Sequence, residues 1–219
     1  MHIKRQNIGK FWPVERKGTK YLAVSRYNKR ESIPLVVVMR NIFKLVRNKK
    51  ELKKIISEKQ IMVNNKVVRD TNFPICLFDI ISLPELKKKY RAILSENKKM
   101  IFNEVSGKES DEKVFRVISK KKLKGNKIQI NCSDGRNFLT NEKINIDDSI
   151  LYNFKHNKIE KIIKMAKGKN AYITKGRYIG DKGVIDSIFD RGGKKLVKIV
   201  RDKDNNKINV WIKNLIVME

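Results

Sequence analysis

An excess of positive charge constrains this chain more than any other feature of its sequence. The 219 residues include 52 Lys and Arg against 23 Asp and Glu, for a formal net charge of +29. The excess runs along the whole length, from 17 basic and 4 acidic side chains in residues 1–60 to 12 basic and 6 acidic in residues 169–219. Because a compact fold with this charge repels itself, the sequence predicts a chain that folds against a polyanion and contacts it on several faces.

Composition narrows the class of protein further. Hydrophobic residues make up 40% of the chain, which excludes a disordered polycation and fits one large domain or two to three small ones. Cys76 and Cys132 lack a Cys or His neighbour at ligand spacing, so we expect reduced, buried thiols and no metal site. No apolar run reaches the ~18 residues that a membrane-spanning helix needs. The charged residues at the N-terminus are not followed by the apolar stretch of a secretory signal. We therefore expect a cytoplasmic protein without membrane contact.

Residues 1–32 form a basic arm without an apolar period of 3.6 or 2.0. Aromatic residues, among them Phe11 and Trp12, are interleaved with the basic ones. Such rings can stack on RNA bases, or they can fix the arm to the protein's own core, and the sequence leaves both interpretations open. The candidate RNA-binding residues of the arm are Lys4, Arg5, Trp12, Arg26, Lys29 and Arg30.

Residues 33–89 are predicted to form two helices and a hairpin. Pro34 suits the first turn of a helix, and apolar residues continue at helical spacing to residue 46. A basic turn at residues 47–50 precedes a second helix over residues 51–59. The period then becomes two, with strands on either side of a turn at Asn64 and Asn65, and another strand follows at residues 77–83.

The rest of the chain is predicted to be mostly strand. Apolar stretches at residues 114–118, 128–130, 144–146 and 150–152, with a turn at 133–136, indicate a small antiparallel domain over residues 90–168. Residues 169–219 continue as strands. A glycine-rich loop at 176–183 leads into a strand and not into a helix, which argues against a nucleotide-phosphate site.

Two segments resemble known RNA-binding modules. The pattern Glu51-Leu52-x-x-Ile55-Ile56, followed by Ile61 to Val68, resembles the S-four RNA-binding domain. Within it, Asn65 and Val68 stand where the ribosomal S-four-e family, described next, usually has Gly and Arg. The glycine block resembles a KOW motif in an SH3-like barrel, which implies that Gly183 is a turn glycine. By resemblance, the RNA-binding candidates are Arg40, Asn41, Lys44, Arg47, Lys53, Lys54, Lys66 and Arg69 in the first module and Lys175, Arg177 and Lys182 in the second.

The order of the modules resembles the archaeal and eukaryotic small-subunit ribosomal S-four-e family. The resemblance also includes Lys4-Arg5 with Trp12 and Asp134-Gly135-Arg136-Asn137, and it adds Arg136 as a candidate contact. It implies an α+β, multidomain fold: an arm at 1–32, an S-four-type domain at 33–89, a central β domain at 90–168 and a KOW barrel at 169–219. It further implies a structural constituent that binds and stabilises small-subunit ribosomal RNA beside neighbouring ribosomal proteins, with no catalytic residues, cofactor, metal or small-molecule substrate.

Two other classes of protein were weighed. S-four domains also occur on pseudouridine synthases, but the residues after Leu83 look like small β modules and not like a large catalytic domain. His2 and His156 are the only histidines, which leaves little for acid–base catalysis by histidine. A transient transcription or ribosome-associated factor with a KOW barrel would leave subunits in moderate salt, and it would not need the concentrated charge of residues 1–60.

Overall fold

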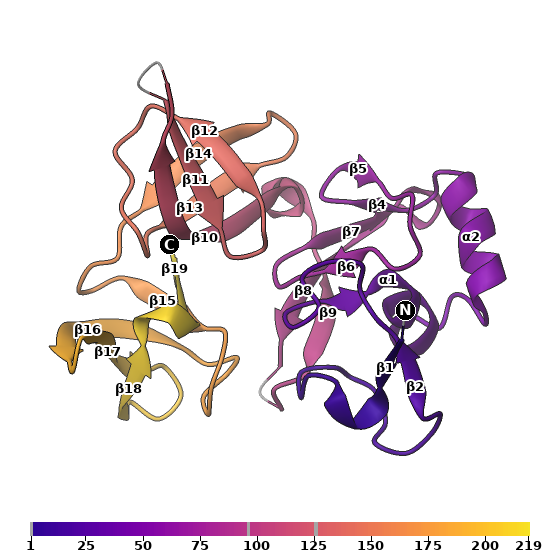
Figure 1. Cartoon of the computed structure of the whole chain (residues 1–219), viewed down its shortest axis with the longest axis horizontal. Coiled ribbons are helices and arrows are strands. Elements are labelled where there is room, and N and C mark those ends of the chain that lie inside the picture. The colour runs from indigo at the N-terminus through magenta and orange to yellow at the C-terminus, as the bar shows by residue number, and fades with distance from the viewer. Residues whose placement is uncertain (1, 96, 125–126) are drawn as a thin grey trace. The chain divides into compact units, whose positions relative to one another are not determined.

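The computed structural model describes residues 2–95, 97–124 and 127–219 (Figure 1). The backbone clusters into two compact units, Met1–Lys113 and Val114–Glu219. Strands dominate both units, and the longest helix has nine residues. The chain is therefore a mostly-strand protein with few helices, built as more than one unit. Among the described residues, no helix is long and apolar enough to cross a membrane.

The main sheet of the first unit has five antiparallel strands in the order β5-β4-β7-β8-β9. Their bounds are Met62–Val63 for β4, Lys66–Val67 for β5, Ile80–Leu83 for β7, Lys88–Leu94 for β8 and Met100–Glu104 for β9. Ile81 pairs with Tyr90, and Tyr90 pairs with Glu104, so the sheet continues past the predicted boundary at residues 89 and 90. The backbone divides instead between Lys113 and Val114.

Two short antiparallel ribbons complete the strands of the first unit. They join β1 (His2–Lys4) to β2 (Tyr21–Ala23) and β3 (Ile33–Pro34) to β6 (Pro74–Ile75). Single 3-10 turns lie at Arg5–Asn7, Pro84–Leu86 and Gly107–Asp111. The central strand β7 is buried at all four positions, which explains its apolar run without alternation: protein covers both of its faces.

The first helical segment is shorter than the sequence predicts. A short α1 (Leu35–Val37) continues into a π-helical turn over Val38–Ile42 and then stops, whereas helical spacing extends to residue 46. Lys44 has a φ of 55°, which no helix accommodates. The ring of Phe43 lies 4.7 Å from that of Tyr90 and 5.3 Å from that of Phe102. Packing against the sheet thus replaces the last predicted helical turn.

The second helix, α2 (Lys49–Ser57), begins two residues earlier than predicted because a side chain caps it. The Asn48 Oδ1 accepts hydrogen bonds from the backbone N–H groups of Lys50 and Glu51, at 2.9 and 3.0 Å. The Glu51 carboxylate in turn accepts one from the backbone N–H of Arg47 at 2.7 Å. This is a variant of the capping box, and the spacing Asn-x-x-Glu is its signal in the sequence.

We expect Asn48→Ala to lower the free energy of unfolding by about 1 kcal/mol, because the first turn of α2 loses its acceptor. Asn48→Asp keeps an oxygen at the same place and should change stability by only a few tenths of a kcal/mol. Urea denaturation followed by far-ultraviolet circular dichroism measures both. Equal losses in the two variants would contradict the capping role.

Strands β4 and β5 are joined by the two-residue turn Asn64–Asn65, since Val63 pairs directly with Lys66. Both asparagines have positive φ, 51° and 58°. Positive φ at both central residues is typical of the type I′ turn, whose twist matches that of the strands. The tight hairpin therefore forms with Asn where a glycine would be the usual choice.

A buried polar network fixes this hairpin to β7. The Asn64 side chain donates to the carboxylate of Asp79 at 2.7 Å and accepts from the backbone N–H of Ile80 at 3.0 Å. The same carboxylate accepts from the Lys113 ammonium and the Cys76 backbone N–H, both at 2.6 Å. The charge of Asp79 is buried but compensated, so each partner fixes the position of the others.

The arm has more internal order than its sequence pattern suggests. Its β1–β2 ribbon pairs Lys4 with Tyr21. The ring of Trp12 is only 2% exposed, and the Lys99 ammonium donates to the Trp12 carbonyl at 3.0 Å. The prediction that Trp12 binds RNA is therefore wrong. Its apolar area is worth more inside the core than at a wet surface, which is the alternative that the sequence left open.

The second unit contains two five-stranded antiparallel sheets, ordered β12-β11-β10-β13-β14 and β18-β17-β16-β15-β19. The strands of the first are Glu112–Lys122 (β10), Ile128–Cys132 (β11), Asn137–Thr140 (β12), Ser149–Asn153 (β13) and Lys158–Ile163 (β14). Those of the second are Asn170–Ile173 (β15), Lys182–Arg191 (β16), Lys194–Arg201 (β17), Lys207–Trp211 (β18) and Leu215–Met218 (β19), with a 3-10 turn at Ile212–Asn214.

Each sheet closes over its own apolar cluster. Phe115, Val117 and Ile150 lie in the first cluster, and Ile173 and Val197 in the second. The predicted turn at residues 133–136 is present between β11 and β12, as are the predicted strands after residue 169. Two separate cores explain why the strands of this unit alternate between buried and exposed positions.

One predicted strand, residues 144–146, is wrong, and β12 and β14 were missed. Ile144 and Ile146 alternate with Asn145, which mimics a strand, but the segment is a loop held by Asp148. The Asp148 carboxylate accepts from the backbone N–H groups of Asn145 and Met165, both at 3.0 Å. Hydrogen bonds from the backbone to a side chain replace here the bonds to a neighbouring strand. A two-residue alternation of apolar and polar residues does not distinguish the two cases.

The predicted role of Gly183 as a turn glycine is also wrong. Gly183 lies within β16, pairs with Ala171 and Arg201, and does not have a positive φ. A Cβ at this position would lie 2.2 Å from the carbonyl oxygen of Val200 and 2.8 Å from a methyl carbon of Ile199. The sequence therefore needs glycine here because two backbones approach closely, and not because the chain turns.

Candidate nucleic-acid interface

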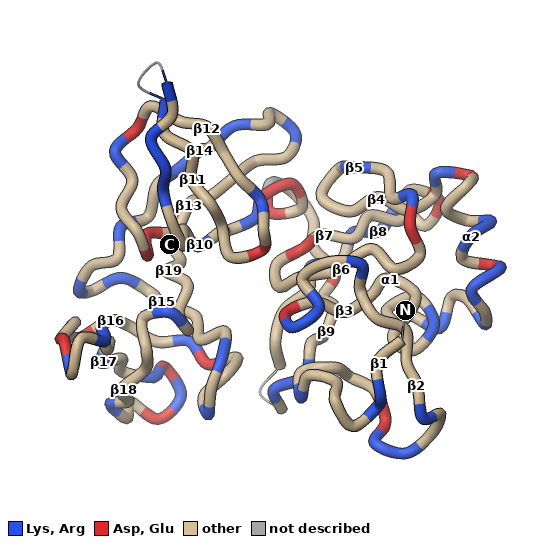
Figure 2. Tube along the Cα trace, in the orientation of Figure 1, with Lys and Arg blue, Asp and Glu red and all other residues tan. Residues whose placement is uncertain are grey.

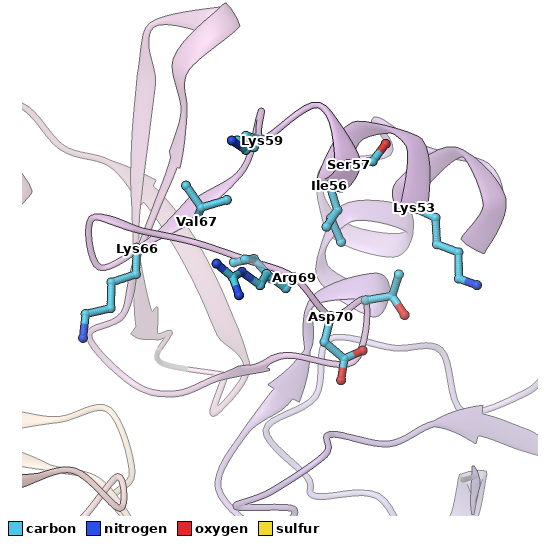
Figure 3. A pocket seen from close by; sticks show the side chains of 10 residues that line it. Lys53, Ile56, Ser57, Lys59, Lys66, Val67, Arg69 and Asp70 are labelled. Atoms are coloured by element: carbon cyan, nitrogen blue, oxygen red, sulfur yellow. The ribbon is translucent and has the colours of Figure 1, made fainter.

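A groove of about 750 Å³ lies between helix α2 and the β4–β5 hairpin in the first unit (Figure 3). The helix supplies one wall, and the strand β5 with the chain that follows it supplies the other. The ten residues that line the groove are Lys53, Ile56, Ser57, Lys59, Lys66, Val67, Val68, Arg69, Asp70 and Thr71.

The local structure explains why basic side chains border this groove. In α2, Leu52 and Ile56 are buried, so the neighbouring Lys53 is left on the exposed part of the helix surface. The tight hairpin then places Lys66 at the start of the opposite wall, and Arg69 follows after the buried Val68. Val68 is therefore a core residue. This agrees with the sequence, in which valine in place of the family's arginine predicts that one RNA contact of the hairpin is lost.

The electrostatics of the groove favour an anionic ligand. Lys53, Lys59, Lys66 and Arg69 are exposed, and Asp70 is the only carboxylate among the ten lining residues. The Asp70 carboxylate already lies 3.7 Å from the guanidinium of Arg26. Four cations beside one paired carboxylate give a strongly positive wall, where phosphate groups gain from charge-assisted hydrogen bonds and counterion release.

The structure brings some of the predicted contacts of the first module together and leaves others apart. Lys53, Lys66 and Arg69 share the groove, whereas Lys54 lies on α2 outside the lining. The remaining predicted residues precede α2 and are exposed: Arg40, Asn41, Lys44 and Arg47. The Arg40 guanidinium donates to the Asn41 side chain at 3.0 Å, so these two residues act as a pair.

Lys59 is a groove residue that the sequence interpretation did not include. It follows the end of α2, where its φ of 60° and its backbone bond to the Ile56 carbonyl close the last helical turn. A basic residue just past a helix C-terminus next to a predicted hairpin was the available signal.

The basic residues of the arm serve two purposes. The Arg5 guanidinium donates to the Thr19 carbonyl at 2.7 Å and to the Thr19 hydroxyl at 3.1 Å, so it organises the arm's own loop. Lys4, Lys29 and Arg30 are exposed. Arg26, through Asp70, lies next to the groove. The arm thus adds Arg26 next to the groove, while Arg5 is used within the arm itself.

The predicted contacts of the second unit also differ in their surroundings. Arg136 lies with its guanidinium 5.0 Å from the centre of the Phe154 ring and 3.7 Å from the Asp134 carboxylate, so its charge is largely used within the fold. Lys175 and Arg177, which lie in the loop between β15 and β16, and Lys182, at the start of β16, are exposed. Lys and Arg occur over both units in Figure 2, as the sequence charge predicts.

Comparisons of this chain with known proteins all indicate the same family. The model of ribosomal family S4e matches residues 86–159. The small ribosomal subunit protein eS4 of Archaeoglobus fulgidus is 32% identical over 213 residues, which cover 96% of this chain and 86% of the relative. That of Methanosphaera stadtmanae is 32% identical over 190 residues, covering 85% of this chain and 79% of the relative.

A solved structure has a similar fold over most of the chain. The crystal structure of the 30S ribosomal protein S4e from Thermoplasma acidophilum matches with a TM-score of 0.73 at 27% identity, over 87% of this chain and 96% of that one. The S-four-e resemblance seen in the sequence is confirmed by these relatives. Identity above 30% across most of the length of both chains leaves one conclusion: this chain belongs to ribosomal family S4e.

Proposed function

We propose that this protein is a structural constituent of the small ribosomal subunit that binds and stabilises the ribosomal RNA of that subunit. The observation that carries the proposal is the groove beside α2, which is lined by four cations and a single carboxylate that is already paired. The relatives are named as small ribosomal subunit proteins, which supports a place in the same particle in the cytoplasm. The proposed role is architectural and involves no turnover and no cofactor.

The groove suits the backbone of folded RNA better than base edges. Ammonium and guanidinium groups on its rim neutralise phosphates, while the exposed Val67 gives the groove an apolar part on which a sugar can rest (Figure 3). In A-form RNA the deep, narrow major groove keeps side chains from the bases. Recognition then depends on the positions of phosphates and 2′-hydroxyls, so specificity comes from the shape of the folded RNA.

The remaining domains have proposed roles in the same assembly. Residues 33–113, which include the whole sheet β5-β4-β7-β8-β9, would act as an S-four-type RNA-binding domain, with residues 1–32 as a basic arm beside it. Residues 169–219 would act as a KOW barrel whose exposed cations Lys175, Arg177 and Lys182 contact a second RNA element. The exposed residues Arg40, Lys44 and Lys54 would extend the first contact. Residues 114–168, as a central β domain, would leave surface for neighbouring ribosomal proteins.

We expect RNA binding by the isolated protein to weaken steeply with salt, because each neutralised phosphate releases a counterion. With six to ten phosphate contacts, affinity for a transcript of small-subunit ribosomal RNA should fall about 10³–10⁵-fold between ~50 and ~200 mM salt. Filter binding over this range measures the slope. Affinity that stays constant with salt would reject the electrostatic interface and, with it, the proposed function.

A further inference from the structure

The second unit presents a sheet face that the predicted contacts do not include. In the register of β16, β17 and β18, three rows of side chains lie on the side of the sheet opposite the apolar cluster of Val197, Ile199 and Val210. We call these nine residues the tryptophan face: Phe189, Leu196 and Trp211; Ser187, Lys198 and Asn209; Val184, Val200 and Lys207.

Trp211 is the most conspicuous residue on the tryptophan face. Its side chain is 37% exposed, while Leu196, directly opposite on β17, is only 8% exposed. Leu196 is thus covered, while the indole next to it in the register keeps part of its surface in contact with solvent. The Lys194 ammonium lies over the ring, 5.5 Å from its centre, so a cation already rests against this surface.

The charged residues on the tryptophan face have one sign. The tryptophan face includes Lys198 and Lys207 but no Asp or Glu, and Lys194 extends it at the β16–β17 end. The carboxylates nearest in the register are those of Asp190 and Asp186. Asp190 pairs with Lys195 one row from Trp211, on the other side of the sheet, and Asp186, at the bulge in β16, lies 3.4 Å from the Lys207 ammonium. Lys194 and Lys198 therefore remain as the cations on either side of the indole.

An exposed aromatic ring on a sheet between lysines is the arrangement that binds unpaired nucleotides. A base stacks on the ring whatever its identity, and the adjacent phosphates bind the cations. Protein interfaces, in contrast, are depleted of lysine near their buried centre. The charge and the ring together thus favour RNA over a protein partner for this face.

We propose that the tryptophan face binds an unpaired segment of RNA, with one base stacked on Trp211 and its flanking phosphates on Lys194 and Lys198. This proposal rests on the proposed function, because it names a second mode of contact with the same RNA. It differs from the groove in kind, since the groove contacts the backbone of folded helices whereas Trp211 requires a base outside any duplex.

Intrinsic fluorescence separates the two modes in the full chain, because the protein has two tryptophans and only one is exposed. Adding a single-stranded uridine dodecamer should quench the Trp211 emission, while a 12-base-pair RNA duplex at equal phosphate concentration should leave it unchanged. Trp12→Phe should keep the quenching and Trp211→Phe should remove it. Trp211→Leu should weaken dodecamer binding, measured by anisotropy of a labelled oligonucleotide, about 10-fold.

Charge variants test the phosphate contacts with a matched control. Lys198→Glu should weaken dodecamer binding more than Lys167→Glu, an exposed lysine outside the face that changes the net charge equally. Thermal melting of Trp211→Phe and Lys198→Glu verifies that both remain folded. Two results would overturn the proposal: dodecamer binding that leaves Trp211 emission unchanged, or equal affinities of Trp211→Leu and the unmodified chain.

Crosslinking in assembled subunits identifies the occupant. Ultraviolet irradiation followed by trypsin should yield a nucleotide adduct on the peptide of residues 208–213, which contains Trp211. The same peptide joined to a protein would show that a protein covers the face and would reject the RNA proposal. Because the experiment starts from subunits that already contain the protein, this failure would leave the proposed function intact.

Discussion

Reversing Lys53, Lys66 and Arg69 to Glu is expected to abolish incorporation of the protein into small ribosomal subunits. The triple variant replaces three of the four groove cations by carboxylates, which leaves Lys59 facing three new anions and Asp70. Lost phosphate contacts and new like-charge repulsion act together, so affinity for the ribosomal RNA should fall at least ~100-fold. All three residues are exposed, and the fold itself should tolerate the change.

Expression of a tagged triple variant beside the unmodified chain, followed by purification of small subunits, measures incorporation. The matched control reverses Lys155, Lys158 and Lys167, three exposed lysines of the second unit outside both proposed surfaces. It changes the net charge by the same amount and should still enter subunits. Normal incorporation of the groove variant would show that the groove does not bind RNA.

Replacing Gly183 by Val is expected to unfold the second sheet of the second unit. The new Cβ would meet the Val200 carbonyl oxygen at 2.2 Å, and backbone at this position cannot move without separating β16 from β17. Overpacking of this kind costs about 3 kcal/mol or more, because no side chain can rotate away to relieve the contact. The cost arises within the strand pair, so the first unit should keep its own structure.

Differential scanning calorimetry with far-ultraviolet circular dichroism measures the effect on the purified variant. Ser187→Val, in the same strand but on the partly exposed side, is the control and should melt close to the unmodified chain. If Gly183→Val melted at an unchanged temperature, the close approach of the two strands would be refuted as the reason for glycine at this position.

The sequence predicts those parts of the fold that depend on neighbouring residues. The Asn64–Asn65 hairpin and the strands after residue 169 were predicted because turn residues and a two-residue period are local signals. The early stop of the first helix was not, because Phe43 leaves the helical path to pack on Tyr90, which is distant in the sequence. Gly183 was misinterpreted for the same reason, since its constraint lies in a neighbouring strand.

In the candidate site, too, some features could be predicted from the sequence and others depend on packing between distant residues. Lys53, Lys66 and Arg69 were predicted to act together because the segment resembles the S-four domain, in which a helix and a hairpin form one RNA-facing surface. The burial of Trp12 and the stacking of Arg136 on Phe154 could not be predicted, because composition does not tell which side of the core an aromatic ring or a cation will reach. Trp211 was not selected as a candidate either, because its exposure depends on strand register, which only the assembled sheet defines.

Sedimentation of a cell extract through a density gradient at high salt tests the central claim most directly. The account predicts that this protein, followed with a specific antibody, migrates stably with the small ribosomal subunit, because contacts on several faces resist removal as a group. Release of the protein into the slowly sedimenting soluble fractions would contradict a structural role and would favour a factor that binds the ribosome only transiently.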